Sequence, residues 1–187
     1  MTQTEKFELK TSNPVWIICP YPTVTLGLAK MMEEEVQVYN GQRLPTEKPP
    51  SSIIFYPDEE NVVSRVRSLQ ALAPDALILV LGLCVDPRLA RVALLAGACG
   101  FIHLGMQPAQ IIHALSEASR DKIVMPRELL EAFLVEIESQ EDPVILSPSQ
   151  REILEEILQL AAETISQNDI VMPRELLEAF LVEVAMA

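Results

Sequence analysis

Residues 71–81 read ALAPDALILVL and residues 93–102 read ALLAGACGFI, and these two stretches decide the fold. Each contains a short apolar run that predicts a buried strand, and the segment 86–96 between them has the apolar spacing of a helix. Gly97 and Gly100 fall at the end of that helix and at the start of the next strand, where a positive φ or a close approach of two backbones is needed. A strand, a helix and a strand in this order predict a parallel pair with a right-handed crossover.

The same alternation extends over the first 120 residues. Strands that alternate with helices predict a parallel sheet with helices on both faces. Between Tyr39 and Ser51 the sequence is short and contains three prolines, so we expect the second helix to be reduced or lost. The predicted strands are 15–19, 36–39, 51–56, 76–82 and 100–104, and the predicted helices are 23–34, 59–72, 86–96 and 107–118.

The two opening stretches resemble the fourth strand, fourth helix and fifth strand of receiver domains of the response-regulator family, in the subclass that also has a LuxR-type DNA-binding domain. Residues 19–22 (CPYP) and 25–28 (TLGL) fill the family's frame after the first strand without a gap. The resemblance implies an α/β, flavodoxin-like fold, with a five-stranded parallel sheet in the order 2-1-3-4-5.

The resemblance also locates the family's phosphorylation site, and every functional position there has a different residue. The acidic pair that binds magnesium is replaced by Cys19 and Pro20. The phosphate-accepting aspartate, the hydroxyl residue and the lysine are replaced by Tyr56, Gly82 and Leu104. None of these supplies a carboxylate for Mg²⁺ or a charge that neutralises a transferred phosphoryl group. We therefore expect no phosphotransfer, no bound metal or cofactor and no enzyme activity.

Two other uses of this site stay open. Asp58 lies two residues past the acceptor position and is a candidate substitute acceptor, although a helix N-cap is the commoner role of such a residue. The vacated site is also a candidate small-molecule pocket, unless its apolar side chains collapse into the core. The residues of that candidate pocket are Cys19, Tyr21, Tyr56, Gly82, Cys84 and Leu104.

The C-terminal part contains one 14-residue segment twice. Residues 123–136 (copy 1) and 170–183 (copy 2) both read IVMPRELLEAFLVE. In each, a proline precedes a helix with an apolar stripe at i, i+3, i+4 and i+7. Each stripe either packs on its own domain or pairs with the other stripe, within one chain or between two chains, where it would form a dimerisation surface. The stripes are Leu130, Phe133, Leu134 and Ile137, and Leu177, Phe180, Leu181 and Val184.

Between the copies, residues 146–158 (LSPSQREILEEIL) resemble the first helix of a LuxR-type helix-turn-helix domain, and residues 162–170 resemble the start of its second helix. Copy 2 then stands where the DNA-reading helix would follow. From residue 141 onward the chain has two arginines against ten acidic residues, a balance that repels DNA. The predicted organisation is a degenerate receiver domain (13–120), a linker helix (121–146) and a helical tail (147–187).

The composition indicates where the protein is located and which partners it can have. The net charge is −13, no apolar run reaches the length of a membrane helix, and three cysteines without C-x-x-C spacing indicate reduced thiols. We expect a cytoplasmic protein without a membrane partner, with His103 and His113 in structural roles. Our leading hypothesis is a pseudo-receiver of two-component signalling, which acts in transcription regulation without phosphorylation, through dimerisation by the surface of residues 86–118 or through another regulatory protein. The alternatives are a LuxR-type regulator that still binds DNA and a small-molecule sensor.

Overall fold

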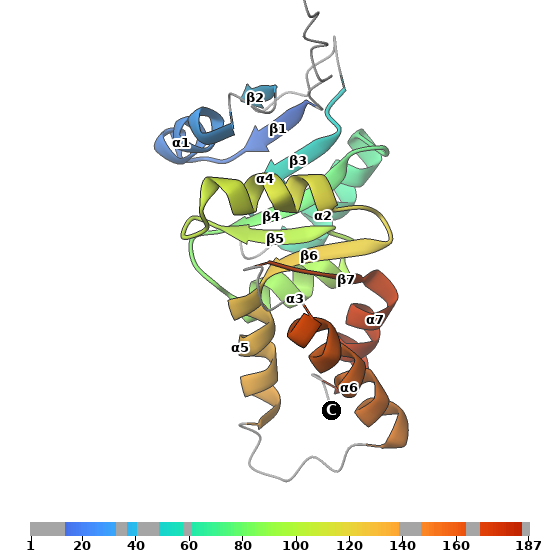
Figure 1. The fold of residues 1–187 in the computed structure, drawn as a ribbon. Coiled ribbons are helices and arrows are strands. Elements are labelled where there is room, and N and C mark those ends of the chain that lie inside the picture. Colours follow the sequence, from blue (N-terminus) through green and yellow to red (C-terminus); the bar gives the residue numbers. More distant parts are fainter. Residues whose placement is uncertain are drawn as a thin grey trace, which may run out of the picture.

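The structure is a computed structural model that describes residues 14–32, 37–40, 49–57, 61–138, 147–163 and 169–184. Strands and helices alternate through most of it (Figure 1). In chain order they are β1 (Val15–Ile18), α1 (Pro22–Met32), β2 (Val38–Asn40), β3 (Ser52–Phe55), α2 (Val62–Leu72), β4 (Leu77–Gly82), α3 (Pro87–Leu95), β5 (Gly100–His103), α4 (Pro108–Glu117), β6 (Lys122–Pro126), α5 (Arg127–Glu138), α6 (Pro148–Glu163), β7 (Asp169–Pro173), α7 (Arg174–Ala179) and the π-helical turn η2 (Phe180–Val184).

The strands form one sheet in the order β2-β1-β3-β4-β5-β6-β7. The first five strands are parallel and follow the predicted order 2-1-3-4-5, which confirms the predicted fold class. β6 is parallel to β5, and β7 is antiparallel to β6. The sheet therefore continues past the strand that was predicted to be its edge.

Strands β6 and β7 correct the five-stranded prediction. The first four residues of each copy form strand, so the segment predicted as a linker helix begins with β6 and becomes helical only at Arg127, and the tail contains β7. The reason is the Ile-Val-Met run before each proline. β-Branched and apolar residues suit a strand that is covered on both faces, and Ile123, Val124 and Met125 are fully buried.

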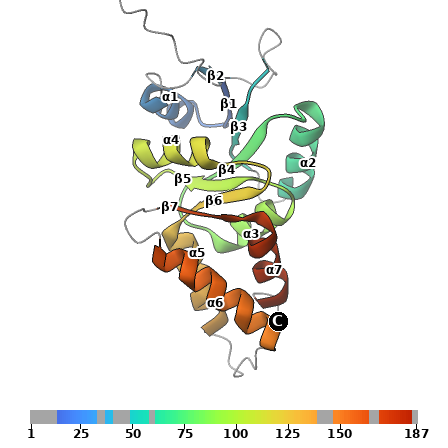
Figure 2. The same cartoon turned by 45° about the vertical axis from the view of Figure 1, so that its right-hand side comes forward.

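Two layers of helices cover the sheet (Figures 1 and 2). One apolar cluster joins one face of the strands to α2, α3, α5, α6 and α7, with Trp16, Phe101 and Phe133 among its largest side chains. A second cluster joins the other face to α1 and α4, through residues such as Ile54 and Leu81. Successive residues of a strand alternate between the two clusters, as the two-residue period of a strand requires.

The two glycines of the opening stretches have the roles predicted for them. Gly97, which follows α3, has a φ of 109°, a conformation that costs glycine little. Gly100 lies against β6: a Cβ there would come within 2.8 Å of the Val124 carbonyl oxygen. Gly100 therefore permits the close approach of β6 to β5.

Two predictions fall on residues outside those that the structure describes. One is the loss of the second helix, which concerns residues 41–48, and the other is the candidate acceptor Asp58. The described residues contain no helix long and apolar enough to cross a membrane.

The helix predicted from the LuxR-type resemblance is present as α6. It begins at Pro148, where the Ser147 hydroxyl accepts a hydrogen bond from the Gln150 backbone N–H (3.3 Å) and the Gln150 side chain accepts one from the Ser147 N–H (2.8 Å). This reciprocal arrangement is a capping box. The next element along the described part of the chain is β7, so Ile170 belongs to a strand of the main sheet and not to a second helix.

Candidate functional site

The positions predicted for the replaced phosphorylation site lie together at the carboxyl edge of the sheet. Cys19 follows β1, Tyr56 follows β3, Gly82 ends β4 and Leu104 follows β5. The Tyr56 N–H donates to the Ile18 carbonyl (2.8 Å), and the Leu104 N–H donates to the Gly82 carbonyl (3.2 Å). Ligands bind at this edge of open parallel sheets, so we define these residues, with Pro20 and Tyr21, as the carboxyl-edge site.

Two tyrosines dominate the part of the site between β1 and β3. The rings of Tyr21 and Tyr56 meet edge to face, with their centroids 5.3 Å apart and their planes at 77°, which is a favourable aromatic contact. Tyr21 is 46% exposed and Pro20 is also exposed, whereas Cys19 and Tyr56 are half-buried. These side chains carry no carboxylate, so this part of the site offers aromatic surface in place of hard oxygen ligands.

Packing closes the position at the end of β4. A Cβ on Gly82 would lie 2.6 Å from the ring of Phe101 and 2.7 Å from the carbonyl oxygen of Cys84. A serine or threonine therefore does not fit there without a shift of the Phe101 ring. At the neighbouring strand end, Leu104 is 40% exposed and adds an uncharged aliphatic side chain.

The carboxyl-edge site offers apolar and aromatic surface and one thiol, that of Cys19. Among the side chains that the structure places, no three histidine, cysteine, aspartate or glutamate residues are arranged to hold a metal ion. The three cysteines are free: Cys84 is exposed, Cys19 is half-buried and Cys99 is buried. This composition suits contact with another apolar group better than it suits charge neutralisation in phosphoryl transfer.

Comparison with known proteins identifies the architecture. No protein-family model matches the chain, and no curated protein matches it in sequence. The RcsB response regulator of Salmonella typhimurium is 17% identical, with a TM-score of 0.56 over 80% of this chain and 78% of that chain. The isolated REC domain of RcsB from Salmonella enterica serovar Typhimurium is 16% identical, with a TM-score of 0.50 over 64% of this chain and 97% of that domain. A response regulator from Thermotoga maritima is 16% identical, with a TM-score of 0.50 over 56% of this chain and 95% of that one.

The chain has the receiver fold of response regulators. Almost the whole isolated receiver domain is matched by about two thirds of this chain, so further structure is attached to the receiver fold. The attached part includes the two copies, which join the receiver sheet beyond β5.

The two copies pair with each other within one chain. β6 and β7 run antiparallel, with the second residue of copy 1, Val124, opposite the second residue of copy 2, Val171. The flanking pairs are reciprocal, so a local two-fold axis passes between the two valines. The paired residues are Lys122–Pro173, Ile123–Met172, Val124–Val171, Met125–Ile170 and Pro126–Asp169.

The stripes that were predicted either to pack on their own domain or to pair are part of the protein's own core. Five of the eight side chains are buried and Leu134 packs against the same cluster. The side chains of Ile137 and Val184 lie outside the described part of the structure. Of the alternatives left open by the sequence, packing within one chain is the one observed. The five buried residues are Leu130, Phe133, Leu177, Phe180 and Leu181.

Copy 1 also covers part of the surface of residues 86–118 that was expected to dimerise. The edge of β5 pairs with β6, and the Val124 N–H donates to the Cys99 carbonyl (3.1 Å). On α3, Arg91 forms an ion pair with Glu136 of α5 and stacks 5.6 Å from the centre of the Phe133 ring. This edge of the sheet and this side of α3 are therefore occupied within the chain.

The arginine at the fifth position of each copy binds the C-terminal end of a neighbouring helix. Arg174 of copy 2 donates to the carbonyls of Ala98 (2.8 Å) and Leu94 (3.5 Å) at the end of α3, and its Nε donates to the Arg120 carbonyl (2.8 Å). Arg127 of copy 1 donates to the Ala161 carbonyl near the end of α6 (3.0 Å). Helix ends leave carbonyls without intrahelical partners, and the two arginines satisfy some of them.

Both histidines of the chain lie where the receiver strands meet the copies. His113 Nδ1 lies 3.7 Å from Asp169 Oδ2, and the Gln110 amide lies 3.5 Å from Asp169 Oδ1. His103 Nδ1 accepts the Gly105 N–H (3.1 Å), which leaves the proton on Nε2, 3.8 Å from Glu128 Oε2. Asp169 is only 3% exposed, and burial raises the pKa of its carboxyl, while the nearby His113 opposes that rise.

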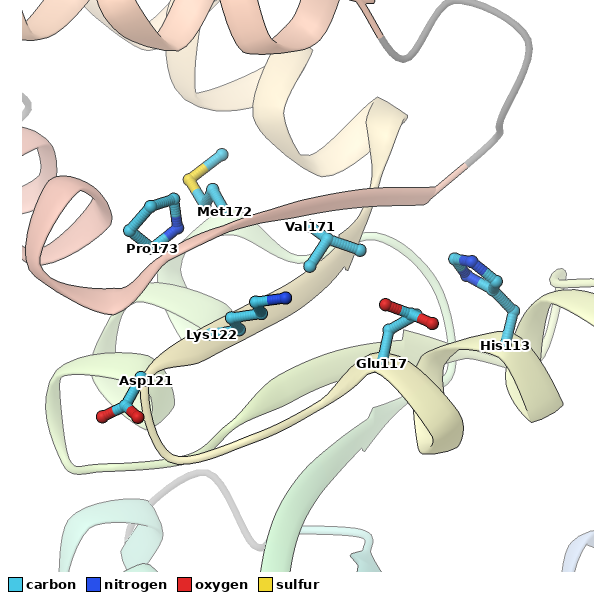
Figure 3. A pocket seen from close by; sticks show the side chains of 7 residues that line it. All are labelled: His113, Glu117, Asp121, Lys122, Val171, Met172 and Pro173. Carbon is cyan, nitrogen blue, oxygen red and sulfur yellow. The ribbon is translucent and has the colours of Figure 1, made fainter.

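A shallow cavity of about 510 Å³ lies between α4 and the β6–β7 pair (Figure 3). In this view Val171 and Lys122 lie on the side of the strands that faces α4, and Met172 points to the opposite side. Charges of both signs line the cavity, so its composition does not favour one class of ligand. Its lining residues are His113, Glu117, Asp121, Lys122, Val171, Met172 and Pro173.

Sequence reasoning located the carboxyl-edge site but missed the histidine contacts. It placed His103 on a strand and His113 on a helix, which is correct, and assigned both to ordinary structural roles. Their carboxylate partners are Glu128, the second residue of α5, and Asp169, the first residue of β7. A signal was available in the Ile-Val-Met runs, because these predict strands once their β-propensity is weighed against the helix that follows.

Proposed function

We propose that this protein is a regulatory module of the two-component type that acts without phosphorylation. In this proposal it transmits a signal in transcription regulation through self-association or through another regulatory protein. The receiver fold serves as a scaffold for these contacts. The carboxyl-edge site is a contact surface and not a phosphoryl acceptor.

The observation that carries the proposal is the aromatic and apolar composition of the carboxyl-edge site. Tyr21 and Tyr56 pack against each other where magnesium ligands and a phosphate acceptor would be required. The backbone at Gly82 leaves no space for a hydroxyl side chain because Phe101 fills it. Loss of one group would weaken phosphotransfer, but replacement of the acids, the hydroxyl and the lysine together removes every source of charge neutralisation.

The matched structures support the regulatory class. The solved structures reported above are response regulators or their receiver domains, and a structure of two RcsB dimers bound to two parallel DNAs matches this chain at 17% identity with a TM-score of 0.54. Self-association is part of the present proposal, whereas DNA binding by this chain alone is not. The acidic tail repels phosphates, and the strand β7 follows α6 where a second DNA-binding helix would begin.

The proposal is tested by adding Mg²⁺ and beryllium fluoride, a phosphoryl analogue, to the ¹⁵N-labelled chain. We expect the amide resonances of Cys19, Tyr56 and Gly82 to stay unchanged at millimolar reagent. Saturable shifts at these amides that require both Mg²⁺ and beryllium fluoride would overturn the proposal. The control variant is Asp58→Asn: shifts that it abolishes would identify Asp58 as the acceptor.

DNA binding is tested separately by fluorescence anisotropy with a mixed-sequence duplex over a salt series. Affinity that depends on phosphate contacts falls steeply as salt rises. We expect no binding at low salt. Micromolar binding with a clear salt dependence would replace the protein-contact proposal with a DNA-binding regulator.

A further inference from the structure

The local two-fold axis between the copies is the type of symmetry found in homodimer interfaces. In a two-fold interface one segment contacts an identical segment, and each contact occurs twice. Here the identical segments belong to one chain, and Ile123 contacts Met172 as Ile170 contacts Met125. The pairing surface of copy 1 is therefore complementary to its own sequence.

Equivalent side chains of the two copies are buried in the same cluster. Leu130 and Leu177 occupy the eighth position of their copies, Phe133 and Phe180 the eleventh, and all four are buried. Copy 1 therefore pairs directly with copy 2 through its strand residues, and the helices of both copies add side chains to one core. Every residue that copy 1 needs from its partner is present in copy 2 of any other molecule of this protein.

We propose that copy 2 exchanges between two chains, so that β7 of each chain pairs with β6 of the other and α7 packs on β6 and α6 of the other. The resulting reciprocal dimer contains the contacts of the monomer, formed between chains. This inference goes beyond the proposed function, because it holds whether or not the carboxyl-edge site accepts a phosphoryl group. The two tests can therefore fail independently.

The balance between monomer and dimer is set by mass action. Within one chain, copy 2 is present at an effective concentration of the order of millimolar, so the monomer prevails in dilute solution. Exchange also requires the Arg174 contacts with Ala98 and Leu94 to open. We therefore expect exchanged dimers to form when the protein refolds at high concentration and to persist after dilution.

The β6–β7 pair offers a covalent test of the exchange. The Val124 N–H points away from β7, because it donates to the Cys99 carbonyl beside β5. The Arg174 N–H donates to the Asp121 carbonyl, so these two residues form a hydrogen-bonded pair three positions away. Hydrogen-bonded and non-hydrogen-bonded pairs alternate in an antiparallel ladder, so Val124 and Val171 form a non-hydrogen-bonded pair. The Cα atoms of such a pair are about 4.5 Å apart, within the range that a disulfide spans. Cysteines at these two positions will crosslink only if the two strands are adjacent.

The experiment uses two full-length chains with different tags, both carrying Cys19→Ser, Cys84→Ser and Cys99→Ala. One chain carries Val124→Cys and the other carries Val171→Cys. The two are unfolded, mixed, refolded at high concentration and oxidised. The matched control pair is Val135→Cys with Val182→Cys, which are the equivalent thirteenth positions of the two copies and are both exposed.

We expect a disulfide-linked heterodimer with a 124–171 crosslink, at about tenfold or more the yield of the control pair, because proximity raises the effective thiol concentration. Absence of this heterodimer, or an equal yield from the control pair, would overturn the proposal. If the cysteine variants do not fold, light scattering of the unsubstituted chain after refolding at increasing concentration decides the question. A dimer that persists on dilution supports exchange, and a monomer at every concentration refutes it.

Discussion

Copy 1 and copy 2 have the same 14 residues but occupy different places in the sheet. Val124 lies between β5 and β7 and is fully buried, whereas Val171 lies on the outer strand and is half-buried. α5 is a regular α-helix through Glu138, whereas α7 passes into a π-helical turn at Phe180. The comparison shows that the same sequence forms a strand followed by a helix in both places. Position in the fold determines how deeply each residue is buried and whether the helix stays regular.

The largest difference between the copies is expected from the same substitution at their second positions. Val124→Asp places a charge in a fully buried position without a partner, at a cost of about 4 kcal/mol or more in the free energy of unfolding. Val171→Asp faces the open cavity beside α4, so we expect a loss of about 1 to 2 kcal/mol. Urea denaturation of both variants measures the difference. Equal losses of stability would contradict the placement of Val124 between two strands and of Val171 on the edge strand.

The contact of copy 1 with the receiver sheet is tested at Gly100. In Gly100→Ala the new Cβ would meet the Val124 carbonyl oxygen at 2.8 Å, and we expect a loss of about 1 to 3 kcal/mol from the forced shift of β6. Gly27→Ala is the control, because a Cβ at Gly27 has no neighbour within 4 Å. That variant should gain about 0.5 to 1 kcal/mol from helix propensity. A neutral Gly100→Ala would contradict the close packing of β5 and β6.

The two arginines at the fifth positions are expected to protect different helix ends. Arg174→Ala removes donors from Leu94 and Ala98, and should cost about 1 to 2 kcal/mol. Hydrogen exchange should then accelerate around the end of α3. Arg127→Ala should instead accelerate exchange near Ala161 in α6. Acceleration in the same segment for both variants would contradict the assignment of each arginine to its own helix.

The smallest effect is expected at the residues that precede the two copies, where copy 1 has Lys122 and copy 2 has Asp169. Burial raises the pKa of Asp169 above its ordinary value of 3.8. Between pH 3.8 and the raised pKa, the carboxyl is therefore protonated in the folded state but ionised in the unfolded chain. The contribution of Asp169 to the free energy of unfolding is most favourable below pH 3.8, and it is lost as the pH rises through the raised pKa. Asp169→Asn should therefore be more stable than the parent at pH 7, by up to about 1 kcal/mol.

The control for Asp169→Asn is the same comparison at about pH 3, below the ordinary pKa of aspartate. There both proteins carry a neutral side chain at residue 169 and should have equal midpoints in thermal unfolding. A variant that is less stable than the parent at pH 7 would show that the attraction of His113 outweighs the cost of burial.

The receiver part of the fold was predictable because its signals are local. Apolar runs set the strands, and Gly97 and Gly100 marked a helix end and a close backbone approach that the structure contains. The carboxyl-edge site followed from the strand ends. The Tyr21–Tyr56 contact and the Phe101 ring below Gly82 did not follow, because they depend on side-chain packing across strands.

The copies were harder to interpret because their apolar stripes fit several partners equally well. The helix after Pro126 was predicted from the spacing of Leu130 and Phe133, and α5 confirms it. The partner of that stripe was decided by β6, which adds to the edge of β5 and brings copy 2 beside copy 1. Strand addition at an edge is a long-range event, and residues 123–126 alone do not specify it.

The central functional claim is that the carboxyl-edge site does not accept a phosphoryl group, and direct labelling tests it most plainly. The purified chain is incubated with ³²P-labelled acetyl phosphate and Mg²⁺, and the label bound per chain is counted. We expect no incorporation above that of a heat-denatured sample. One phosphoryl group per chain, lost in Asp58→Asn, would contradict it and return the protein to phosphorylation-dependent signalling.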